Sequence, residues 1–266
     1  MIEFFINQNH VIQALIATLF TWFITCLGAS FVFFFKKINK NVMDAMLGFS
    51  GGVMIAASFW SLLSPAIELA NSLNLTTWLV ASFGFISGGM LLFIGDKVFD
   101  HLTKKKLNDI NNSLKRSLML ISSITLHNIP EGLVVGVAFG SIFYNLEGAT
   151  LLSASLLALG IGIQNFPEGT AVSLPLRREG FSRKKAFFYG QLSGIVEPIS
   201  GVIGCLLALK IRIILPFLLA FAAGAMIYAV VVEIIPESQT NKKKNLMALF
   251  TLIGFSIMMI LDIALG

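Results

Sequence analysis

The chain has 266 residues, of which 56% are hydrophobic and only 12% charged, and its formal net charge is +5. Soluble globular proteins carry about 25% charged residues, so this composition excludes an ordinary water-soluble domain and predicts a polytopic protein embedded in a lipid bilayer. The Lys and Arg residues cluster between apolar stretches and form no basic stripe interleaved with aromatic residues, so nucleic acid is not an expected partner. The first ten residues contain no Lys or Arg, so we interpret the first apolar stretch as a permanent span rather than a cleaved signal.

Apolar stretches of membrane-spanning length recur along the whole chain. A helix needs roughly 20 apolar residues to cross a bilayer core about 30 Å thick. On that measure the fold class is all-α, a polytopic integral membrane protein with eight transmembrane helices in a single transporter domain over residues 1–266. The predicted spans are 11–35, 43–70, 75–96, 117–140, 148–176, 184–210, 212–236 and 246–265. The polar, basic connection between spans three and four, residues 97–116, is predicted to be a mobile cytoplasmic loop.

The distribution of basic residues predicts the orientation of these spans. Apart from Lys210 and Arg212, every Lys and Arg follows span one, three, five or seven. The positive-inside rule places such loops in the cytoplasm. We therefore expect both termini on the extracytoplasmic side of the cytoplasmic (inner) membrane.

Two pairs of spans resemble each other in sequence. Span two contains Gly52-Val53-Met54-Ile55 and later Pro65, and span seven contains Gly224-Ala225-Met226-Ile227 and later Pro236. In the predicted topology these two spans run in opposite directions, as do spans four and five. Antiparallel segments of similar sequence indicate inverted repeats, here arranged as three, two and three spans, as in many secondary transporters. Chance similarity between Gly-rich apolar helices is the alternative.

A six-residue pattern occurs once in span four and once in span five. His127-Asn128-Ile129-Pro130-Glu131-Gly132 is answered by Gln164-Asn165-Phe166-Pro167-Glu168-Gly169. The first and fifth positions of each copy lie one turn apart on the same helix face, so their side chains are directed to one point. The proline at the fourth position removes a backbone donor and predicts a kink, and the final glycine permits close helix approach.

Three glutamates inside predicted spans have no intramembrane Lys or Arg to pair with. They are Glu131, Glu168 and Glu197. A charged side chain at the centre of a transmembrane helix costs about 2.5–3.5 kcal/mol. Protonation would remove this cost for a single glutamate. Three glutamates accompanied by the imidazole and amides of the two motifs favour instead a divalent cation in a hydrated cavity.

The ligand types limit the identity of the metal. Imidazole suits zinc and other divalent transition metals, whereas carboxylate and amide oxygens suit harder or larger ions. Thiolate ligands are not expected, because Cys26 and Cys205 lie in separate apolar spans without metal-ligand spacing. Weak ligation suits an ion that has to leave as well as enter. Zn²⁺ is therefore the preferred ion, with Cd²⁺, Fe²⁺ or Mn²⁺ as alternatives, and the metal is cargo rather than a cofactor.

With these motifs the chain resembles the ZIP (Zrt/Irt-like) family of divalent metal transporters, in its prokaryotic GufA-like branch, over essentially its whole length. The resemblance implies ion uptake toward the cytoplasm and a binuclear metal centre at mid-membrane in kinked helices four and five. The first implied site consists of His127, Glu131, Gln164 and Glu168. The second consists of Asn128, Asn165 and Glu197, with Glu168 and Glu131 as bridging candidates.

The sequence departs from the commoner family pattern at two of these positions. Gln164 stands where His is usual, and Asn165 stands where some relatives carry a carboxylate. A neutral oxygen ligand at Gln164 is expected to soften the preference for zinc and admit other divalent ions. The amide of Asn165 makes the second site less negative, so that one metal is a sufficient alternative to two.

Other side chains toward the span ends are candidates for the ion pathway. They are Met54, Glu68, Asp96, His101, Glu233, Glu237 and Asp262. Core packing is the simpler interpretation of the methionine, and a solvated helix end is an equal alternative for the others.

These residues together predict a transporter that moves divalent metal ions by alternating access. An enzyme is not expected, because neither a His-Glu-x-x-His motif nor a positioned nucleophile accompanies the glutamates. The alternative function is a proton-coupled carrier of another substrate, with the glutamates as a proton relay. A membrane homodimer is compatible with the sequence.

Overall fold

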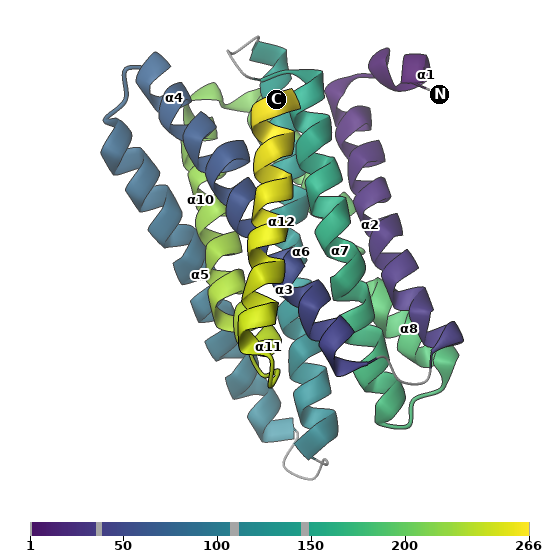
Figure 1. Cartoon of the computed structure of the whole chain (residues 1–266). Coiled ribbons are helices and arrows are strands. Elements are labelled where there is room, and N and C mark those ends of the chain that lie inside the picture. Colours follow the sequence, from purple (N-terminus) through teal and green to yellow (C-terminus); the bar gives the residue numbers. More distant parts are fainter. Residues whose placement is uncertain (1, 36–38, 107–111, 145–148, 266) are drawn as a thin grey trace.

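The computed structural model describes residues 2–35, 39–106, 112–144 and 149–265, and every regular element in these ranges is a helix (Figure 1). The elements are α1 (Ile2–Ile6), α2 (His10–Phe34), α3 (Lys40–Ala57), η1 (Ser58–Leu63), α4 (Ser64–Ser72), α5 (Thr77–Lys106), α6 (Asn112–Ser141), η2 (Ile142–Tyr144), α7 (Leu151–Arg178), α8 (Arg183–Leu192), α9 (Val196–Lys210), η3 (Arg212–Ile214), α10 (Leu215–Ala229), η4 (Val230–Ile234), α11 (Ile235–Ser238) and α12 (Lys244–Leu265). The expected all-α class is confirmed.

Local sequence signals determine where α7, one of the two motif helices, begins and ends. Thr150 caps its start through a reciprocal pair of hydrogen bonds with Ser153. At its end, Gly180 adopts a φ of +93°, and the N–H of Phe181 donates to the carbonyl of Leu176 at 3.2 Å. This is the Schellman arrangement, which favours glycine because a side chain is strained at positive φ.

Seven helical segments in the described part of the chain are long and apolar enough to cross a membrane. They are His10–Phe34, Lys40–Ser72, Thr77–Val98, Ile124–Tyr144, Arg183–Lys210, Arg212–Ser238 and Lys244–Ala264. These segments match seven of the eight predicted spans, so the polytopic membrane character is confirmed. The fifth predicted span corresponds to α7, which has 28 residues but is too polar to be among the seven. Its interior carries Gln164, Asn165 and Glu168.

The polar segment 97–116 is more helical than the loop predicted there. α5 continues to Lys106 and α6 begins at Asn112, while residues 107–111 lie outside the described residues. Lysine has a high helix propensity and is favourable in the last turn of a helix, which accounts for the extension of α5 through Lys104–Lys106. The predicted loop over residues 97–116 is therefore wrong for residues 97–106 and 112–116, which are helical.

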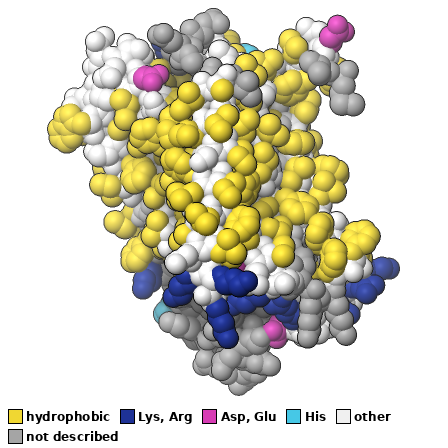
Figure 2. Space-filling view, in the orientation of Figure 1, with side chains coloured by type: hydrophobic (Ala, Val, Ile, Leu, Met, Phe, Trp, Pro, Cys, Tyr) yellow, Lys and Arg dark blue, Asp and Glu magenta, His cyan; other side chains and the backbone are white. Residues whose placement is uncertain are grey.

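Both ends of the chain lie at the same end of the helix bundle. α1 and the last turn of α12 lie there together, whereas the C-terminal ends of α2, α5, α7 and α11 lie at the opposite end (Figure 1). Figure 2 shows Lys and Arg side chains gathered at that opposite end and hydrophobic side chains covering the face between the two ends. The apolar belt and the segregated charges follow the pattern of a membrane-embedded bundle.

The long helices pack as four close pairs: α2 with α7, α6 with α9, α3 with α12, and α5 with α10. Further contacts of α2 with α6 and α9, and of α6 with α7, unite α2, α6, α7 and α9 into a first helix group. The helices α3, α5, α10 and α12, with the short elements attached to them, form a second helix group, which meets the first mainly through α3 against α7 and α10 against α6.

The two motif glycines allow the close approach that the sequence predicts. A methyl group on Gly132 would overlap the backbone of Glu197 in α9, and one on Gly169 would overlap the carbonyl oxygen of Thr25 in α2. Both contacts lie within the first helix group. The motif helices are thus held at backbone distance from their partners.

Two helices are interrupted by π-helical segments at corresponding places. η1 separates α3 from α4, and η4 separates α10 from α11. Each follows one of the similar sequences 52–55 and 224–227, and each precedes a helix whose second residue is proline, Pro65 or Pro236. The similarity between these spans therefore extends to an uncommon backbone feature, one that is frequent at functional sites.

Candidate metal centre

The two copies of the six-residue pattern lie near the middle of α6 and α7. Pro130 and Pro167 lie inside these helices, at the positions where the sequence predicts kinks. All the predicted metal ligands are at most 4% exposed: His127, Asn128, Glu131, Gln164, Asn165, Glu168 and Glu197. Burying such polar groups is costly unless each finds a partner, so their contacts indicate what the site is built to hold.

The four residues predicted to form the first site lie on α6 and α7, and two of them contact each other directly. Gln164 Nε2 donates to Glu131 Oε1 at 2.6 Å and so joins the two helices. The hydroxyl of Ser50 in α3 lies 3.5 Å from Glu168 Oε1 and 3.3 Å from the carbonyl oxygen of Gln164. His127 lies one turn before Glu131 on α6. These contacts lie where α6 and α7 meet α3.

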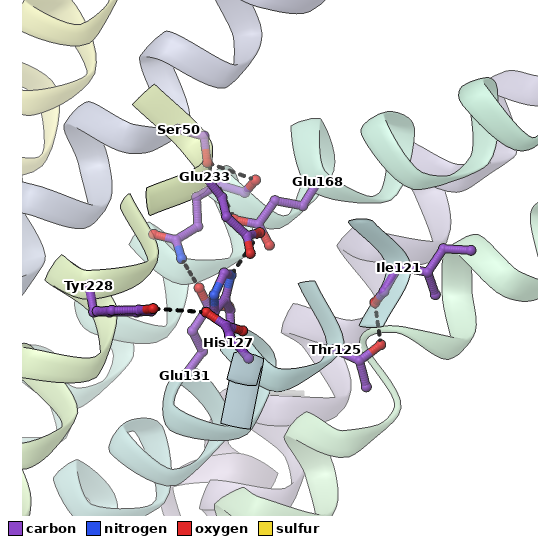
Figure 3. Close-up of polar contacts among 10 residues, drawn as sticks. Ser50, Ile121, Thr125, His127, Glu131, Glu168, Tyr228 and Glu233 are labelled. Carbon is purple, nitrogen blue, oxygen red and sulfur yellow. Dashed lines mark hydrogen bonds and ion pairs between the residues drawn. The ribbon is translucent and has the colours of Figure 1, made fainter. Parts of the chain in front are cut away.

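Glu233 of η4 joins this group from the second helix group. Its Oε2 lies 3.7 Å from His127 Nδ1. Figure 3 shows the side chains of Glu168, His127 and Glu233 directed toward one another. The sequence marked Glu233 only as a pathway candidate, and the structure places it beside the motif. The site thus lies between the two helix groups.

Several buried ligand atoms at this place have no hydrogen-bond partner among the described residues. They are His127 Nε2, Glu131 Oε2, Gln164 Oε1, Glu168 Oε2 and Glu233 Oε2. An unsatisfied buried polar atom costs about 1–3 kcal/mol, and more when it is charged, so folded proteins retain few of them. One imidazole nitrogen and several oxygens facing the same region form a donor set that suits a divalent transition-metal cation.

Glu197, assigned to the second site, has different surroundings. It lies in the first turn of α9, where the sixth span resumes after a break, and Pro198 follows it as the sequence suggested. Both of its oxygens accept hydrogen bonds of 2.9 Å from Asn165 Nδ2, and Oε2 also accepts from the hydroxyl of Thr21 in α2. Glu197 and Asn165 are thus brought together, as expected, but by direct hydrogen bonds.

The other amide of the second site, Asn128, is also engaged. Its Nδ2 donates to the carbonyl oxygen of Ser193 at 2.9 Å. Its Oδ1 and that of Asn165 have no hydrogen-bond partner. Each amide therefore uses its donor group for helix packing and retains an unused acceptor.

Within the described residues, no three side chains of the His, Cys, Asp and Glu types form a group that could hold a metal ion. The candidate site accordingly depends on an amide as well. The side chain of Gln164 contacts Glu131 directly, and Ser50 contacts both the backbone carbonyl of Gln164 and the carboxylate of Glu168. The side-chain oxygen of Gln164 supplies the donor that a carboxylate or a second imidazole would otherwise provide.

The remaining pathway candidates, Met54, Glu68 and Asp262, also lie on elements of the second helix group. Met54 is buried in the core. Glu68 is exposed, and it accepts a hydrogen bond of 3.1 Å from Ser64, one turn before it. Asp262 of α12 accepts a 2.7 Å hydrogen bond from Ser61 in η1 through Oδ1, while its buried Oδ2 has no hydrogen-bond partner.

The candidates at the end opposite the termini, Asp96, His101 and Glu237, all belong to the second helix group. Asp96 accepts a hydrogen bond of 3.0 Å from the hydroxyl of Tyr228, which links α5 to α10. His101 and Glu237 are exposed. These contacts tie Asp96 to packing and leave the other two free to meet ions in solution.

A cavity of about 170 Å³ lies beside the candidate metal centre. Its charged lining residues are Lys40, Asp44, Arg178, Glu233 and Glu237. Glu233 belongs both to this lining and to the group around His127, so the cavity adjoins the site. Lys40 is the first residue of α3 and Arg178 the last of α7, and these two helix ends lie away from the chain termini (Figure 1).

A family model described as "ZIP Zinc transporter" matches residues 103–262, which is more than half of the chain and includes both motifs. The chain belongs to the ZIP zinc transporter family. The resemblance drawn from the motifs is therefore confirmed.

Named relatives of this ZIP protein cover nearly its full length. Zinc transporter ZIP11 of Homo sapiens is 38% identical, with 98% of this chain and 99% of the relative covered. Zinc transporter GufA of Myxococcus xanthus is 33% identical, with 95% and 98% covered. Zinc transporter ZIPB of Bordetella bronchiseptica is 33% identical, with 98% and 84% covered. All three are named as transporters, so the prediction of a transporter rather than an enzyme is confirmed.

Two residues around the site of this ZIP protein were not predicted from its sequence. Thr21 belongs to a series with Thr18 and Thr25, spaced three and four residues apart and all buried. This spacing marks a polar stripe on one face of an apolar span and is a usable signal. Ser50 lies in a glycine-rich stretch that carries no comparable pattern.

Proposed function

We propose that this member of the ZIP family transports divalent metal ions, with Zn²⁺ as the first cargo, through the site between α6, α7 and η4. The proposal rests on one observation: buried nitrogen and oxygen atoms that could bind a metal lack a hydrogen-bond partner. They belong to His127, Glu131, Gln164, Glu168 and Glu233. A passing cation would satisfy these atoms. The names of the relatives support zinc as the ion.

The amide of Gln164 has two roles in this proposal. Its Nε2 positions Glu131 at 2.6 Å, and its unpartnered Oε1 offers a neutral ligand. An oxygen in place of a second imidazole makes the site less selective for zinc, because oxygen donors suit harder and larger ions. Cd²⁺, Fe²⁺ and Mn²⁺ are therefore proposed as further cargo.

We further propose that the chain crosses the membrane eight times. Both chain ends lie at the same end of the bundle, which requires an even number of crossings (Figure 1). The seven apolar segments become eight when α7, which has 28 residues, is included. The polar residues of α7 are acceptable because they face other helices and not lipid, as their burial shows.

The proposed inverted repeat relates the first three spans to the last three, with α6 and α7 between them. Under this repeat, the pair α2–α7 corresponds to the pair α9–α6, and the pair α3–α12 corresponds to the pair α10–α5. These are the four closely packed pairs described above. In the same repeat, the π-helical segments η1 and η4 occupy corresponding places. Such a repeat provides alternating access when one part of the bundle moves against the other around a fixed site.

The proposed direction of transport is uptake across the cytoplasmic membrane. The positive-inside rule assigns the Lys- and Arg-rich end to the cytoplasm and the termini to the outside. The cavity beside Glu233 adjoins the site and is lined by Lys40 and Arg178 of the same basic clusters, so it supplies a cytoplasmic exit. Glu237 and His101 at this end, and Glu68 and Asp262 at the other, are proposed pathway residues.

The finer expectation of a second ion at Asn128, Asn165 and Glu197 stays a prediction, as does a homodimer. The hydrogen bonds of Glu197 bear on the second ion and are taken up below.

Zinc flux into proteoliposomes that contain the purified full chain tests the function. Glu168→Ala removes a carboxylate of the site and is expected to reduce zinc and cadmium flux to the level of empty liposomes. Glu3→Ala changes an exposed glutamate in α1 and is expected to leave flux unchanged. Wild-type flux from Glu168→Ala would overturn the proposed site.

The same vesicles separate metal transport from a proton relay. A proton-coupled carrier of another substrate would show proton flux that depends on Glu168 and is indifferent to zinc. Zinc flux that saturates and is competed by cadmium supports metal transport instead.

A further inference from the structure

Glu197 is the one predicted metal ligand whose charged oxygens are all engaged by the protein. Asn165 Nδ2 lies 2.9 Å from both oxygens, and the Thr21 hydroxyl, which also lies 3.0 Å from the Thr18 carbonyl oxygen, is a second donor to Oε2. Hydrogen bonds to a charged group are roughly twice as strong as those between neutral groups. The Glu197 carboxylate is therefore satisfied without a cation.

The carboxylates of the first site present the opposite case. Glu131 and Glu168 each retain one oxygen without a hydrogen-bond partner. Glu233 does as well, although this oxygen lies 3.7 Å from His127 Nδ1. The need for a cation is thus unequal across the predicted binuclear centre. It is strong on the side of His127 and absent at Glu197.

The two sets of residues also belong to different parts of the bundle. The donors to Glu197 come from α2 and α7, so this cluster lies wholly within the first helix group. The carboxylate oxygens without a hydrogen-bond partner belong to residues near the junction of the two groups, where Ser50 of α3 and Glu233 of η4 take part. In the second set, the oxygens without such a partner are the neutral amide oxygens of Asn128 and Asn165. Only the junction adjoins the cavity lined by Glu233.

The backbone gives Glu197 a further source of charge compensation. It lies in the first turn of α9, a helix of 15 residues. The N-terminal turn of a helix stabilises a negative charge through its unpaired N–H groups and dipole. Together with the amide and the hydroxyl, this explains how a carboxylate that is 0% exposed is tolerated.

The side chain at position 165 determines whether this residue binds a metal ion or donates a hydrogen bond to Glu197. The Asn165 amide nitrogen donates to Glu197, and also to the carbonyl oxygen of Thr21 at 3.3 Å, whereas a carboxylate at this position would accept only. Two facing carboxylates would repel each other and would require a cation between them. Asn165 therefore replaces the cation that a second site would need.

We infer that this chain binds one divalent cation at its centre and that Thr21 and Asn165 hold Glu197 as a hydrogen-bonded strut between α2, α7 and α9 in place of a second metal site. Thr21 and Asn165 are positioning residues for Glu197. The inference rests on the proposed function for the first ion and goes beyond it in the number of ions bound.

The test is the number of Zn²⁺ or Cd²⁺ ions bound per chain, measured on the purified full-length protein by isothermal titration and by metal analysis after gel filtration. The wild type is expected to bind one ion. Asn165→Asp removes the donor and adds a carboxylate, and it is expected to bind two. Glu197→Gln keeps a side chain of the same shape and is expected to remain at one.

A matched pair of variants examines Thr21. Thr21→Val removes the hydroxyl at nearly constant volume, leaves Asn165 as the one side-chain donor to Glu197 Oε2 and is expected to permit a second, weaker ion. Thr21→Ser retains the hydroxyl and is expected to bind one. A purely structural role for Thr21 would change stability in both variants without a second binding event.

The outcomes separate this inference from the proposed function. Two ions bound by the wild type, with one lost in Glu197→Gln, would overturn the strut while leaving metal transport intact. One ion bound by Asn165→Asp would also contradict it. Absence of both bound metal and metal flux in the wild type would overturn the proposed function and the strut together.

Discussion

Replacing Glu168 by glutamine should make the metal-free protein more stable while removing its response to zinc. Glu168 is 2% exposed, its Oε2 has no hydrogen-bond partner, and its Oε1 has only the 3.5 Å contact with Ser50. The change preserves the shape of the side chain and removes the charge. It also places an N–H₂ donor among the unpartnered oxygens of Glu131, Gln164 and Glu233.

The expected gain in stability follows from the cost of the buried polar atom that the substitution removes. A buried unsatisfied polar group costs about 1–3 kcal/mol, and more when it is charged, so Glu168→Gln should gain at least this much without metal. A change of 1 kcal/mol moves the melting temperature of a chain of this size by about 2–4 °C. The metal-free variant should therefore melt several degrees above the metal-free wild type.

With zinc present, the wild type should become more stable than Glu168→Gln. A ligand at a concentration 100 times its Kd stabilises the state that binds it by about 2.7 kcal/mol. The wild type should gain this stabilisation, whereas Glu168→Gln lacks a charged ligand and should show little shift. Thermal unfolding of both proteins in detergent, with chelator and then with a zinc series, measures these effects. A lower metal-free melting temperature for the variant, or an equal response to zinc, would refute the reasoning.

Three further predictions concern selectivity, packing and topology. Gln164→His supplies a second imidazole and should shift competition between zinc and cadmium toward zinc; an unchanged competition profile in the flux assay would contradict this. Gly136→Ala would overlap the carbonyl oxygen of Gly201 and should cost about 1–3 kcal/mol of unfolding free energy. Its control, Gly95→Ala, places a methyl 3.6 Å from the nearest atom, Leu126 Cδ1, and should be neutral or stabilising, so equal melting temperatures would count against the packing argument. Epitope tags at either terminus should be accessible to antibody on intact cells, and protection of both tags would reverse the topology.

The positions of the helices and of the first site could be predicted from the sequence because their signals are local. Apolar length identified the spans, and a carboxylate such as Glu131 or Glu168 inside an apolar helix is conspicuous by its cost. The spacing of four residues then placed each carboxylate beneath His127 or Gln164. These inferences needed no knowledge of which helices touch.

The position of Glu233 depends on a backbone irregularity that the sequence does not reveal. Each residue of an α-helix turns by about 100°, so the extra residue in a π-helical turn rotates everything after it by that angle. η4 (Val230–Ile234) contains Glu233 and brings it 3.7 Å from His127 Nδ1. A regular helix drawn from the sequence would direct this side chain elsewhere.

The contact between Thr21 and Glu197 is hidden for a different reason. It joins residues separated by 176 positions in the chain. No local pattern connects the first span with the sixth, and only the packed fold brings them together. The prediction of Glu197 as a ligand recognised its burial correctly and could not include the donors that satisfy it.

The low hydropathy of α7 also bears on how the protein enters the bilayer. α7 is the longest helix of the described chain that does not qualify as a span by itself. Polar residues such as Gln164, Asn165 and Glu168 disfavour partition of an isolated helix into lipid by several kcal/mol. Insertion of α7 must therefore wait for neighbours that cover its polar face, and α2 and α6 are both synthesised before it. The helix that carries three of the seven predicted metal ligands is for this reason also the one whose insertion depends most on helices already in place.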